Sequence, residues 1–281
     1  MILCGDALAV LKTMRAATFD GAFCDPPYGL TFMGRQWDKG VPGWETWAEV
    51  LRVLKSGAML LAFGGTRTHH RLACAIEDAG FELVDVLIWL HGQGFPKAKS
   101  QLKPAWEPII MARKRGAIRP LAIDASRIKT RGVNLGRWPA NVILDEDAAA
   151  ALDAQSGHLV SGNNPAKRSA DKHRTIYAGW KGEQCLVHRG TDSGGASRFF
   201  YCAKASRSER GDNTHPTVKP LKLTEYLARL ILPPDGGKLI VPFAGSGSEM
   251  LGARRAGWKV TGIESDAAYV KIAERRLAAT A

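Results

Sequence analysis

The six residues from Phe23 to Tyr28, with the sequence Phe-Cys-Asp-Pro-Pro-Tyr, are the strongest candidates for chemistry in this chain. An apolar approach typical of a buried strand ends at Asp25, and the two prolines that follow interrupt any hydrogen-bond ladder. Because prolines have no backbone N–H, the loop offers mainly acceptors: the Asp25 carboxylate and the carbonyl between Pro26 and Pro27. Tyr28 adds a flat face on which a base lifted out of its stack could lie. The loop therefore predicts a site for a substrate that donates through an amine, such as the exocyclic amine of a nucleobase.

A second candidate site is the run Phe243-Ala-Gly-Ser-Gly247, which follows an apolar strand. Glycines at such a turn let the backbone approach a ligand closely. Glu264 lies 19 residues after Gly245, at the tip of the next expected strand, where a carboxylate can accept from both ribose hydroxyls. The sixth position of the dinucleotide fingerprint is Met250 rather than glycine, which argues against a pyrophosphate and favours a nucleoside without phosphates. S-adenosylmethionine is such a nucleoside, and its methyl group could be transferred to an amine bound at the Asp-Pro-Pro-Tyr loop.

The residues around both sites alternate between apolar strands and amphipathic helices. This alternation predicts an α/β fold with a mostly parallel sheet and right-handed crossovers. Strand 81–90 is apolar enough to be covered on both faces, and Gly57 is expected to end the second helix. The other strands are expected at 1–4, 19–24, 58–63, 107–112 and 258–263, with one more from 238 into the glycine turn, and the helices at 7–14, 44–54, 68–79, 221–232, 249–256 and 266–277. Between 113 and 213 the pattern is irregular, and only 148–152 and 198–202 are expected to be regular elements.

The chain order of the two sites indicates a circular permutation. The glycine strand and the Glu264 strand would be the first two of a nucleotide-binding half, yet they come last, and Asp6 and Asp25 end what would be its third and fourth strands. Ligands in such folds bind at the carboxyl ends of strands, near the point where the strand order reverses. We therefore expect Asp6, Asp25, Gly245 and Glu264 to lie around one crevice.

The composition disfavours membrane, secreted and metal-binding classes. The chain has no run of about 18 apolar residues that could span a membrane, and its N-terminus lacks the regions of a signal peptide. Cys185, His188, Cys202 and His215 could be imagined as a zinc site, but no paired Cys-x-x-Cys is present, so no metal is expected. An odd number of scattered cysteines is typical of a reduced, cytoplasmic protein; they are Cys4, Cys24, Cys74, Cys185 and Cys202.

The positive charge is unevenly distributed. The formal net charge is +12, but residues 1–96 carry 8 basic and 10 acidic residues, whereas residues 97–137 carry 11 basic and 2 acidic ones. A generally basic solvated surface would spread the charge more evenly. Its concentration in a region punctuated by glycine and proline favours a segment that binds a polyanion.

Together these motifs resemble the β-class amino DNA methyltransferases. That family has an Asp-Pro-Pro-Tyr catalytic loop first, a target-recognition region second and a Phe-x-Gly-x-Gly cofactor motif last, as here. The segment 214–220, Thr-His-Pro-Thr-Val-Lys-Pro, is similar to the one that precedes the cofactor motif in this family. Segments 103–113, 136–141 and 197–204 are similar to stretches of phage and prophage members, so the resemblance covers nearly the whole chain.

The resemblance implies a circularly permuted, Rossmann-like class I methyltransferase fold, with a mostly parallel seven-stranded sheet and an inserted, irregular target-recognition region. Residues 1–112 would form the catalytic half, 113–213 the target-recognition region and 214–281 the half that binds S-adenosylmethionine. The expected reaction is methylation of the N6 amine of a flipped adenine in double-stranded DNA. A homodimer is also implied, and a cognate restriction enzyme is a further partner to consider.

The resemblance also assigns roles to individual residues. The Asp25 carboxylate and the Pro26 carbonyl, beside Pro27, would accept from the target amine, and Tyr28 would stack on the base. Glu264 would hold the ribose of the cofactor and Asp6 would meet its adenine. The remaining cofactor residues would be Lys219, Pro220, Phe243, Ala244, Gly245, Ser246 and Gly247. Phosphates would be held by Lys97, Lys99, Lys103, Arg113, Lys114 and Arg115, and phosphates or guanine edges by Arg127, Arg131, Arg137, Arg168, Arg174 and Arg198.

The chain departs from the commonest family pattern at two places, and several alternatives stay open. Ser248 and Glu249 stand where Thr-Thr is usual, and Pro242 stands where Asp often precedes the Phe, which leaves the contact to the methionine amino group unassigned. N4-cytosine methylation uses the same amine geometry, although that group often has Ser in place of Asp25. RNA methylation, an inactive DNA-binding relative and an NAD-dependent oxidoreductase are the more distant alternatives.

Overall fold

The computed structural model describes residues 1–30, 38–92, 94, 96, 102–129, 136–160, 192–203, 213 and 218–279. The helices are α1 (Ala7–Thr13), α2 (Trp44–Val53), α3 (His69–Asp78), α4 (Glu146–Ser156), α5 (Leu221–Leu230), α6 (Ser248–Ala256) and α7 (Ala267–Ala278), with short 3-10 turns at Asp124–Ser126 and Ala196–Phe199. The strands are β1 (Ile2–Cys4), β2 (Phe19–Cys24), β3 (Leu54–Phe63), β4 (Phe81–Leu90), β5 (Trp106–Lys114), β6 (Val142–Asp145), β7 (Leu159–Val160), β8 (Ser193–Gly194), β9 (Tyr201–Ala203), β10 (Lys238–Val241) and β11 (Lys259–Glu264). No helix in these ranges is long and apolar enough to cross a membrane.

The centre of the fold is one mostly parallel sheet, which confirms the predicted α/β class. Within the described residues it has nine strands in the order β1-β11-β10-β2-β3-β5-β4-β6-β9. Only β5 runs antiparallel to its neighbours, β3 and β4. The carboxyl ends of β1, β11, β10, β2 and β3 therefore meet at one edge, where the amino end of β5 joins them. The circular permutation stays a prediction.

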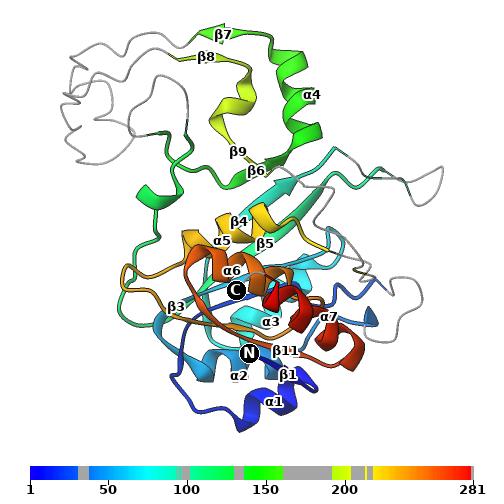
Figure 1. Ribbon diagram of the computed structural model, residues 1–281, viewed down its shortest axis with the longest axis vertical. Coiled ribbons are helices and arrows are strands. Elements are labelled where there is room, and N and C mark those ends of the chain that lie inside the picture. The colour runs from blue at the N-terminus through cyan, green and yellow to red at the C-terminus, as the bar shows by residue number, and fades with distance from the viewer. Residues whose placement is uncertain are drawn as a thin grey trace.

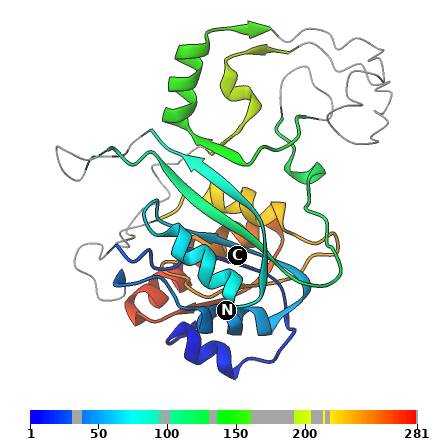
Figure 2. The same cartoon turned by 180° about the vertical axis from the view of Figure 1, so that it is seen from behind.

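Helices cover both faces of the sheet (Figures 1 and 2). Successive side chains of a strand point to opposite faces, so Leu61 and Phe63 of β3 pack under α5 and α6, whereas Leu60 and Ala62 pack under α1, α2 and α3. Each face has its own buried apolar cluster. The edge of the sheet between these two layers is left for loops, and the candidate site residues follow the strands there.

Aspartates start three helices directly after strands. Asp6 follows β1 and accepts from Ala9 N at 2.9 Å, Asp145 ends β6 and accepts from Ala148 N at 2.7 Å, and Asp266 follows β11 and accepts from Ala268 N at 2.8 Å. A side-chain acceptor at this position satisfies a backbone N–H that the first helical turn leaves free. The strand-to-helix turns at the site edge are thereby fixed in position.

The sheet is longer than the seven strands that we predicted. Strands β6 and β9, from the region predicted to be irregular, continue it beyond β4 through the parallel pairs Ile88 with Val142 and Ile143 with Tyr201. Helix α4 and the small β7–β8 pair lie above these strands in Figure 1. The proposed target-recognition region is thus attached to the main sheet, so its orientation is tied to that of the catalytic edge.

Two local predictions were wrong. Strand β4 is not covered on both faces, because its residues Glu82 to Val86 are exposed and β6 pairs only with Ile88–Leu90. Gly57 does not end α2: that helix ends at Val53, and Gly57 lies inside β3 with a φ of +73°. A Cβ at Gly57 would lie 1.9 Å from the Ala117 carbonyl oxygen, so a close passage of two chain segments requires the glycine.

Candidate functional site

Four residues were predicted to share a crevice: Asp6, Asp25, Gly245 and Glu264. All four follow or end strands at the carboxyl edge of the parallel sheet. Cys4 pairs with Glu264, so Asp6, one turn past β1, lies beside the end of β11. Strand β10, which leads into the glycine turn, lies between β11 and β2, and Asp25 directly follows β2. The topology therefore places the nucleoside-type acceptors and the Asp-Pro-Pro-Tyr loop along one edge of the sheet.

Asp25 lies in a compact hydrogen-bonded cluster. Its Oδ1 accepts from the Tyr28 hydroxyl at 2.7 Å, and its Oδ2 accepts from Lys219 Nζ at 2.7 Å. The same ammonium lies 3.3 Å from Glu107 Oε2 and 3.2 Å from the Tyr28 hydroxyl oxygen, which is itself 3.0 Å from Glu107 Oε2. Lys219 therefore donates to Asp25 and to the Tyr28 hydroxyl oxygen and forms an ion pair with Glu107. Each Asp25 oxygen keeps a second lone pair with which it can accept from a substrate.

Burial sets the electrostatics of this cluster. Burial raises the pKa of Asp25, and the neighbouring Lys219 ammonium acts in the opposite direction. For Lys219, burial alone would lower the pKa, but the charges of Asp25 and Glu107 hold it above its ordinary value. Burial likewise holds the pKa of Tyr28 well above its ordinary value. The cluster thus combines a Lys219 ammonium that is held charged, a Tyr28 phenol that is held neutral, and carboxyl oxygens that accept from both.

Loops from two other elements fix the backbone around Tyr28. Thr68, just before α3, donates from Oγ1 to the Tyr28 carbonyl at 2.6 Å. The buried Asp38 accepts from Gly29 N at 2.8 Å and from Leu30 N at 3.2 Å. These bonds anchor the backbone just after the prolines, where the strand ladder has ended.

The glycine turn has the open backbone that a close-lying ligand requires. Gly245 and Gly247 have φ of +51° and +85°, a region that side chains disfavour. Glu264 Oε2 accepts from Gly245 N at 2.8 Å, and its Oε1 accepts from Asp266 N at 2.8 Å. Phe243 is half-buried, with its ring 6.2 Å from that of Trp47. The turn and the carboxylate are held together, and Glu264 retains lone pairs with which it can hold a diol.

Other residues predicted to contact a cofactor have structural partners here. Ala244 is buried and donates its N–H to the Ile263 carbonyl, and Ser246 Oγ lies 2.8 Å from Asn213 Nδ2. Pro220 precedes the first turn of α5, and its carbonyl accepts from Thr224 N. Lys219 directs its ammonium into the Asp25 cluster. These contacts therefore join neighbouring segments at the same edge of the sheet.

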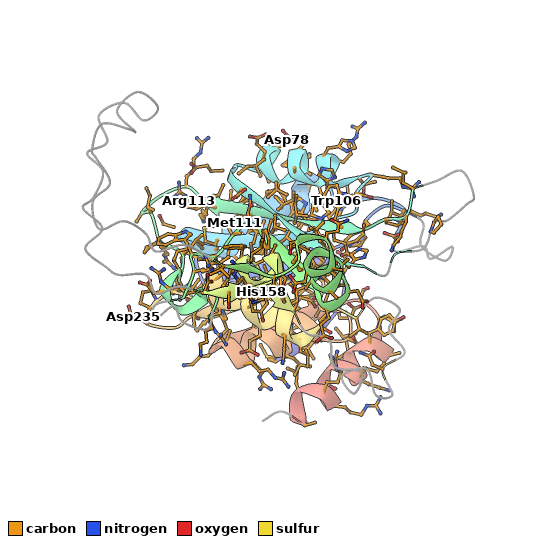
Figure 3. The ribbon with its side chains drawn as sticks, turned by 90° about the horizontal axis from the view of Figure 1, so that it is seen from above. Asp78, Trp106, Met111, Arg113, His158 and Asp235 are labelled. Carbon is orange, nitrogen blue, oxygen red and sulfur yellow. The ribbon has the colours of Figure 1, made fainter. Side chains whose placement is uncertain are left out.

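Part of the predicted DNA-contacting set lies away from this edge. Arg113, Lys114 and Arg115 stand at the carboxyl end of the antiparallel β5, whereas Trp106 stands at its amino end, so Figure 3 shows Trp106 and Arg113 on opposite sides of the sheet. Arg113 pairs with Glu82 at 2.7 Å, and Lys114 donates to the carbonyls of Leu51 and Leu54. We therefore leave these three residues out of the proposed DNA contacts.

The remaining predicted DNA contacts, other than Arg137 and Arg198, are either Lys103 and Arg127 or residues outside the described ranges. Lys103 is exposed near the catalytic edge and donates to the Gly92 carbonyl. Arg127 pairs with Asp124 and lies 5.2 Å from the ring centroid of the exposed Trp138. Lys97, Lys99, Arg131, Arg168 and Arg174 lie outside the described residues, as do Cys185, His188 and His215, which were considered as zinc ligands.

Arg137 and Arg198 form a buried ionic centre in the middle region. Both pair with Asp192, whose side chain is 0% exposed, and both guanidinium groups lie 4.3 Å from the Phe199 ring centroid. Arg198 also donates to the carbonyls of Gly194 and Gly195 at 2.9 and 2.8 Å. These two arginines, predicted to contact DNA, therefore hold the region together instead of extending into solvent.

We expect Asp192→Ala to lower the free energy of unfolding by about 3–5 kcal/mol, because it leaves two partly buried guanidinium groups without their carboxylate. Urea denaturation followed by circular dichroism measures this change. Asp124→Ala is the matched control, since its side chain is 88% exposed and its pair with Arg127 is worth at most about 1 kcal/mol. Equal stability of the two variants would contradict the structural role of Asp192.

Sequence reasoning missed Glu107 as a site residue. It faces Tyr28 and Lys219 from β5, 79 residues away from Tyr28 in the chain. The only available signal was a charged residue inside the apolar run Trp-Glu-Pro-Ile-Ile-Met. A lone acid in a buried strand calls for a partner, but the sequence did not reveal which one.

Comparisons with known proteins agree with this geometry. The family model described as "DNA methylase", which groups N6 and N4 methyltransferases, matches residues 19–275. The DNA adenine methyltransferase YhdJ of Escherichia coli K12 is 26% identical, over 98% of this chain and 82% of its own. The structure of the M1.HpyAVI complex with SAM has a TM-score of 0.55 and 18% identity and covers 98% of both chains. The cytosine-N4-specific PvuII DNA methyltransferase has a TM-score of 0.59 and 17% identity, over 98% of this chain and 85% of its own. Because the family model spans most of the chain, this protein belongs to the DNA methylase family of N6 and N4 methyltransferases.

Proposed function

We propose that this protein transfers a methyl group from S-adenosylmethionine to the N6 amine of an adenine flipped out of double-stranded DNA. The observation that carries the proposal is the Asp25 carboxylate, held by Tyr28 and Lys219 at the end of the strand next to β10, which leads into the glycine turn. Membership of the DNA methylase family supports DNA as the substrate, and the M1.HpyAVI complex supports the cofactor.

The residues of the crevice fit the proposed cofactor. Glu264, fixed by the Gly245 and Asp266 amides, would accept from the ribose hydroxyls, and Asp6 would lie by the adenine. Phe243 and the glycine turn would border the nucleoside. When bound, S-adenosylmethionine supplies an electrophilic methyl group on a sulfonium sulfur.

Asp25 would act on the amine through hydrogen bonding rather than through strong base catalysis. The lone pair of an aromatic amine is delocalised into its ring, which makes the nitrogen a poor nucleophile. The Asp25 carboxylate and the Pro26 carbonyl, aimed at the two amine hydrogens, would favour a pyramidal nitrogen with its lone pair directed at the methyl group. The nitrogen becomes acidic only as the new bond forms, and the Asp25 carboxylate is placed to take its proton. Tyr28 would present its ring to the flipped base.

The proposal also specifies which base is methylated, adenine or cytosine. An Asp before Pro-Pro-Tyr favours adenine, and YhdJ carries the name of an adenine methyltransferase. The PvuII enzyme, which has a similar fold, is cytosine-N4-specific, so N4-cytosine methylation is the second candidate.

Product analysis distinguishes these candidates. The purified protein is incubated with unmethylated DNA and S-adenosylmethionine, the DNA is digested to nucleosides, and the product is identified by mass spectrometry. We expect N6-methyladenine. Detection of N4-methylcytosine would leave the mechanism unchanged but show that cytosine, not adenine, is the target base. If neither product formed although cofactor binding had been demonstrated, DNA methylation by this chain would be contradicted.

The middle region, residues 113–213, is proposed to contact the DNA through residues other than Arg113, Lys114, Arg115 and the ion-paired Arg137 and Arg198, together with Lys103 at the catalytic edge. Arg127 and the exposed Trp138 offer a cation and a flat ring side by side. Phosphate contacts release counterions, so the DNA affinity should fall steeply between low and physiological salt. The resemblance to dimeric family members further predicts a homodimer, which sedimentation of the free protein would detect.

A further inference from the structure

Glu249, the second residue of α6, is an acid with no evident structural role. It is 4% exposed, and within the described residues no hydrogen bond joins its carboxylate to a side chain or to another residue's backbone. Its own backbone amide is the one hydrogen-bond partner there. Burying a carboxylate without a cationic partner costs free energy, because its hydration is not replaced. Such a side chain needs a reason to remain at this position.

The charged groups around Glu249 include two members of the catalytic cluster, Asp25 and Lys219. Its charge interacts with that of Asp25, at the end of β2, and with the thiol of Cys24. Two cations face it, Lys219 from the segment before α5 and Arg276 from α7. Lys219 is engaged with Asp25, and Arg276 donates to the Ser246 carbonyl at 2.6 Å. Neither cation forms an ion pair with the Glu249 carboxylate in the described structure. This carboxylate is therefore available to accept from a cationic ligand group.

The proposed cofactor brings such a group. Its sulfonium must lie next to the amine that Asp25 holds, and only two methylene groups and the α-carbon separate this sulfur from a primary ammonium. The ammonium must therefore reach a point close to Asp25, on the side of the glycine turn. Pro242, immediately before Phe243, is buried and has no side-chain acceptor. Glu249 begins the helix that the same turn leads into.

We propose that Glu249 is the residue that binds the α-ammonium of S-adenosylmethionine, and this inference rests on the proposed cofactor. The ammonium supplies the ionic partner that the buried carboxylate lacks. Burial, with a smaller contribution from Asp25, raises the pKa of Glu249 to about 7, which agrees with a group whose ionised form is incompletely stabilised until a cation arrives.

Two ligands that differ in the amino-acid tail test the proposal. S-adenosylhomocysteine carries the ammonium, and 5′-methylthioadenosine keeps the adenine, ribose and sulfur but lacks the tail. We expect Glu249→Gln to weaken the binding of S-adenosylhomocysteine roughly 10- to 100-fold, which is the effect of losing a hydrogen bond to a charged group. Isothermal titration calorimetry measures this affinity. The affinity for 5′-methylthioadenosine should change by less than about twofold, because that ligand has no group for Glu249.

Glu264→Gln is the matched control, since Glu264 is proposed to hold the ribose that both ligands share. It should weaken both ligands by similar factors. Equal weakening of both ligands by Glu249→Gln, or no change for either, would overturn the role of Glu249. Failure of the wild-type protein to bind either ligand would instead reject the proposed cofactor.

The Tm of the free protein provides a readout that does not depend on ligand affinity. If Glu249 is kept for the ammonium, Glu249→Gln should raise the Tm of the free protein, because it removes an unpaired buried charge, and should reduce the Tm increase caused by S-adenosylhomocysteine. If Glu249 instead stabilises the fold, the substitution lowers the Tm of the free protein. Glu249→Asp, which keeps the charge on a shorter side chain, should retain more of the affinity for S-adenosylhomocysteine than Glu249→Gln.

Discussion

Methyl transfer is expected to fall by at least about 10³-fold when Asp25 is replaced by alanine, the size of effect seen when a group that stabilises the transition state is removed. The substitution removes the acceptor that would polarise the amine and take its proton. The Asp25 carboxylate is bound by Lys219, whereas the nucleoside is proposed to be held by Glu264 and the glycine turn, which are joined to each other. Binding of S-adenosylmethionine and DNA should therefore be largely retained.

Single-turnover assays with tritiated cofactor measure the rate of transfer, and calorimetry and fluorescence anisotropy measure the two affinities. Asp25→Asn is an informative second variant, because it keeps one carbonyl-type acceptor but places N–H donors towards Tyr28 or Lys219. Its activity should lie between those of the wild type and Asp25→Ala. Asp124→Ala, at an exposed ion pair, should leave the rate unchanged. Turnover of Asp25→Ala near the wild-type rate would remove Asp25 from the mechanism.

The second large effect is expected at Lys219. Replacement by methionine removes the ammonium that is 2.7 Å from Asp25 Oδ2 and 3.3 Å from Glu107 Oε2, and leaves two carboxyl groups facing each other without a cation. Since burial raises the pKa of Asp25 and Lys219 opposes this, loss of Lys219 must raise that pKa further. More of Asp25 is then protonated at neutral pH, and a protonated carboxyl has lost an acceptor site for the amine.

We therefore expect Lys219→Met to lower kcat at neutral pH by roughly 10²-fold, with partial recovery as the pH rises. The acidic limb of the pH–rate profile should move to higher pH than in the wild type. Lys222→Met is the matched control, because Lys222 is an exposed lysine in the first turn of α5, three residues after Lys219. A loss confined to the KM for the cofactor, with an unshifted pH profile, would assign Lys219 to cofactor binding, as the family resemblance implied.

The sequence alone determined the two motifs and most of the regular elements outside the middle region. The bounds of β2 and β4 match the predicted ranges, and α1, α2, α3 and α7 begin within one residue of their predicted starts. Apolar periodicity, turn residues and glycines are local properties, so a local pattern is enough to predict them. The same reasoning predicted that Asp6, Asp25, Gly245 and Glu264 would share an edge, because parallel strands end together.

Only the tertiary structure decided which charged side chains meet. Lys219 reaches Asp25 across 194 residues of sequence, and Glu107 joins them because β5 runs antiparallel, a direction that its composition does not encode. The same reversal carries Arg113 to the far edge of the sheet, where positive charge alone had indicated DNA contact. Burial around Asp192 likewise turned two arginines into structural ion pairs. Charge is a property of the sequence, but its partner and its exposure are set by packing between distant segments.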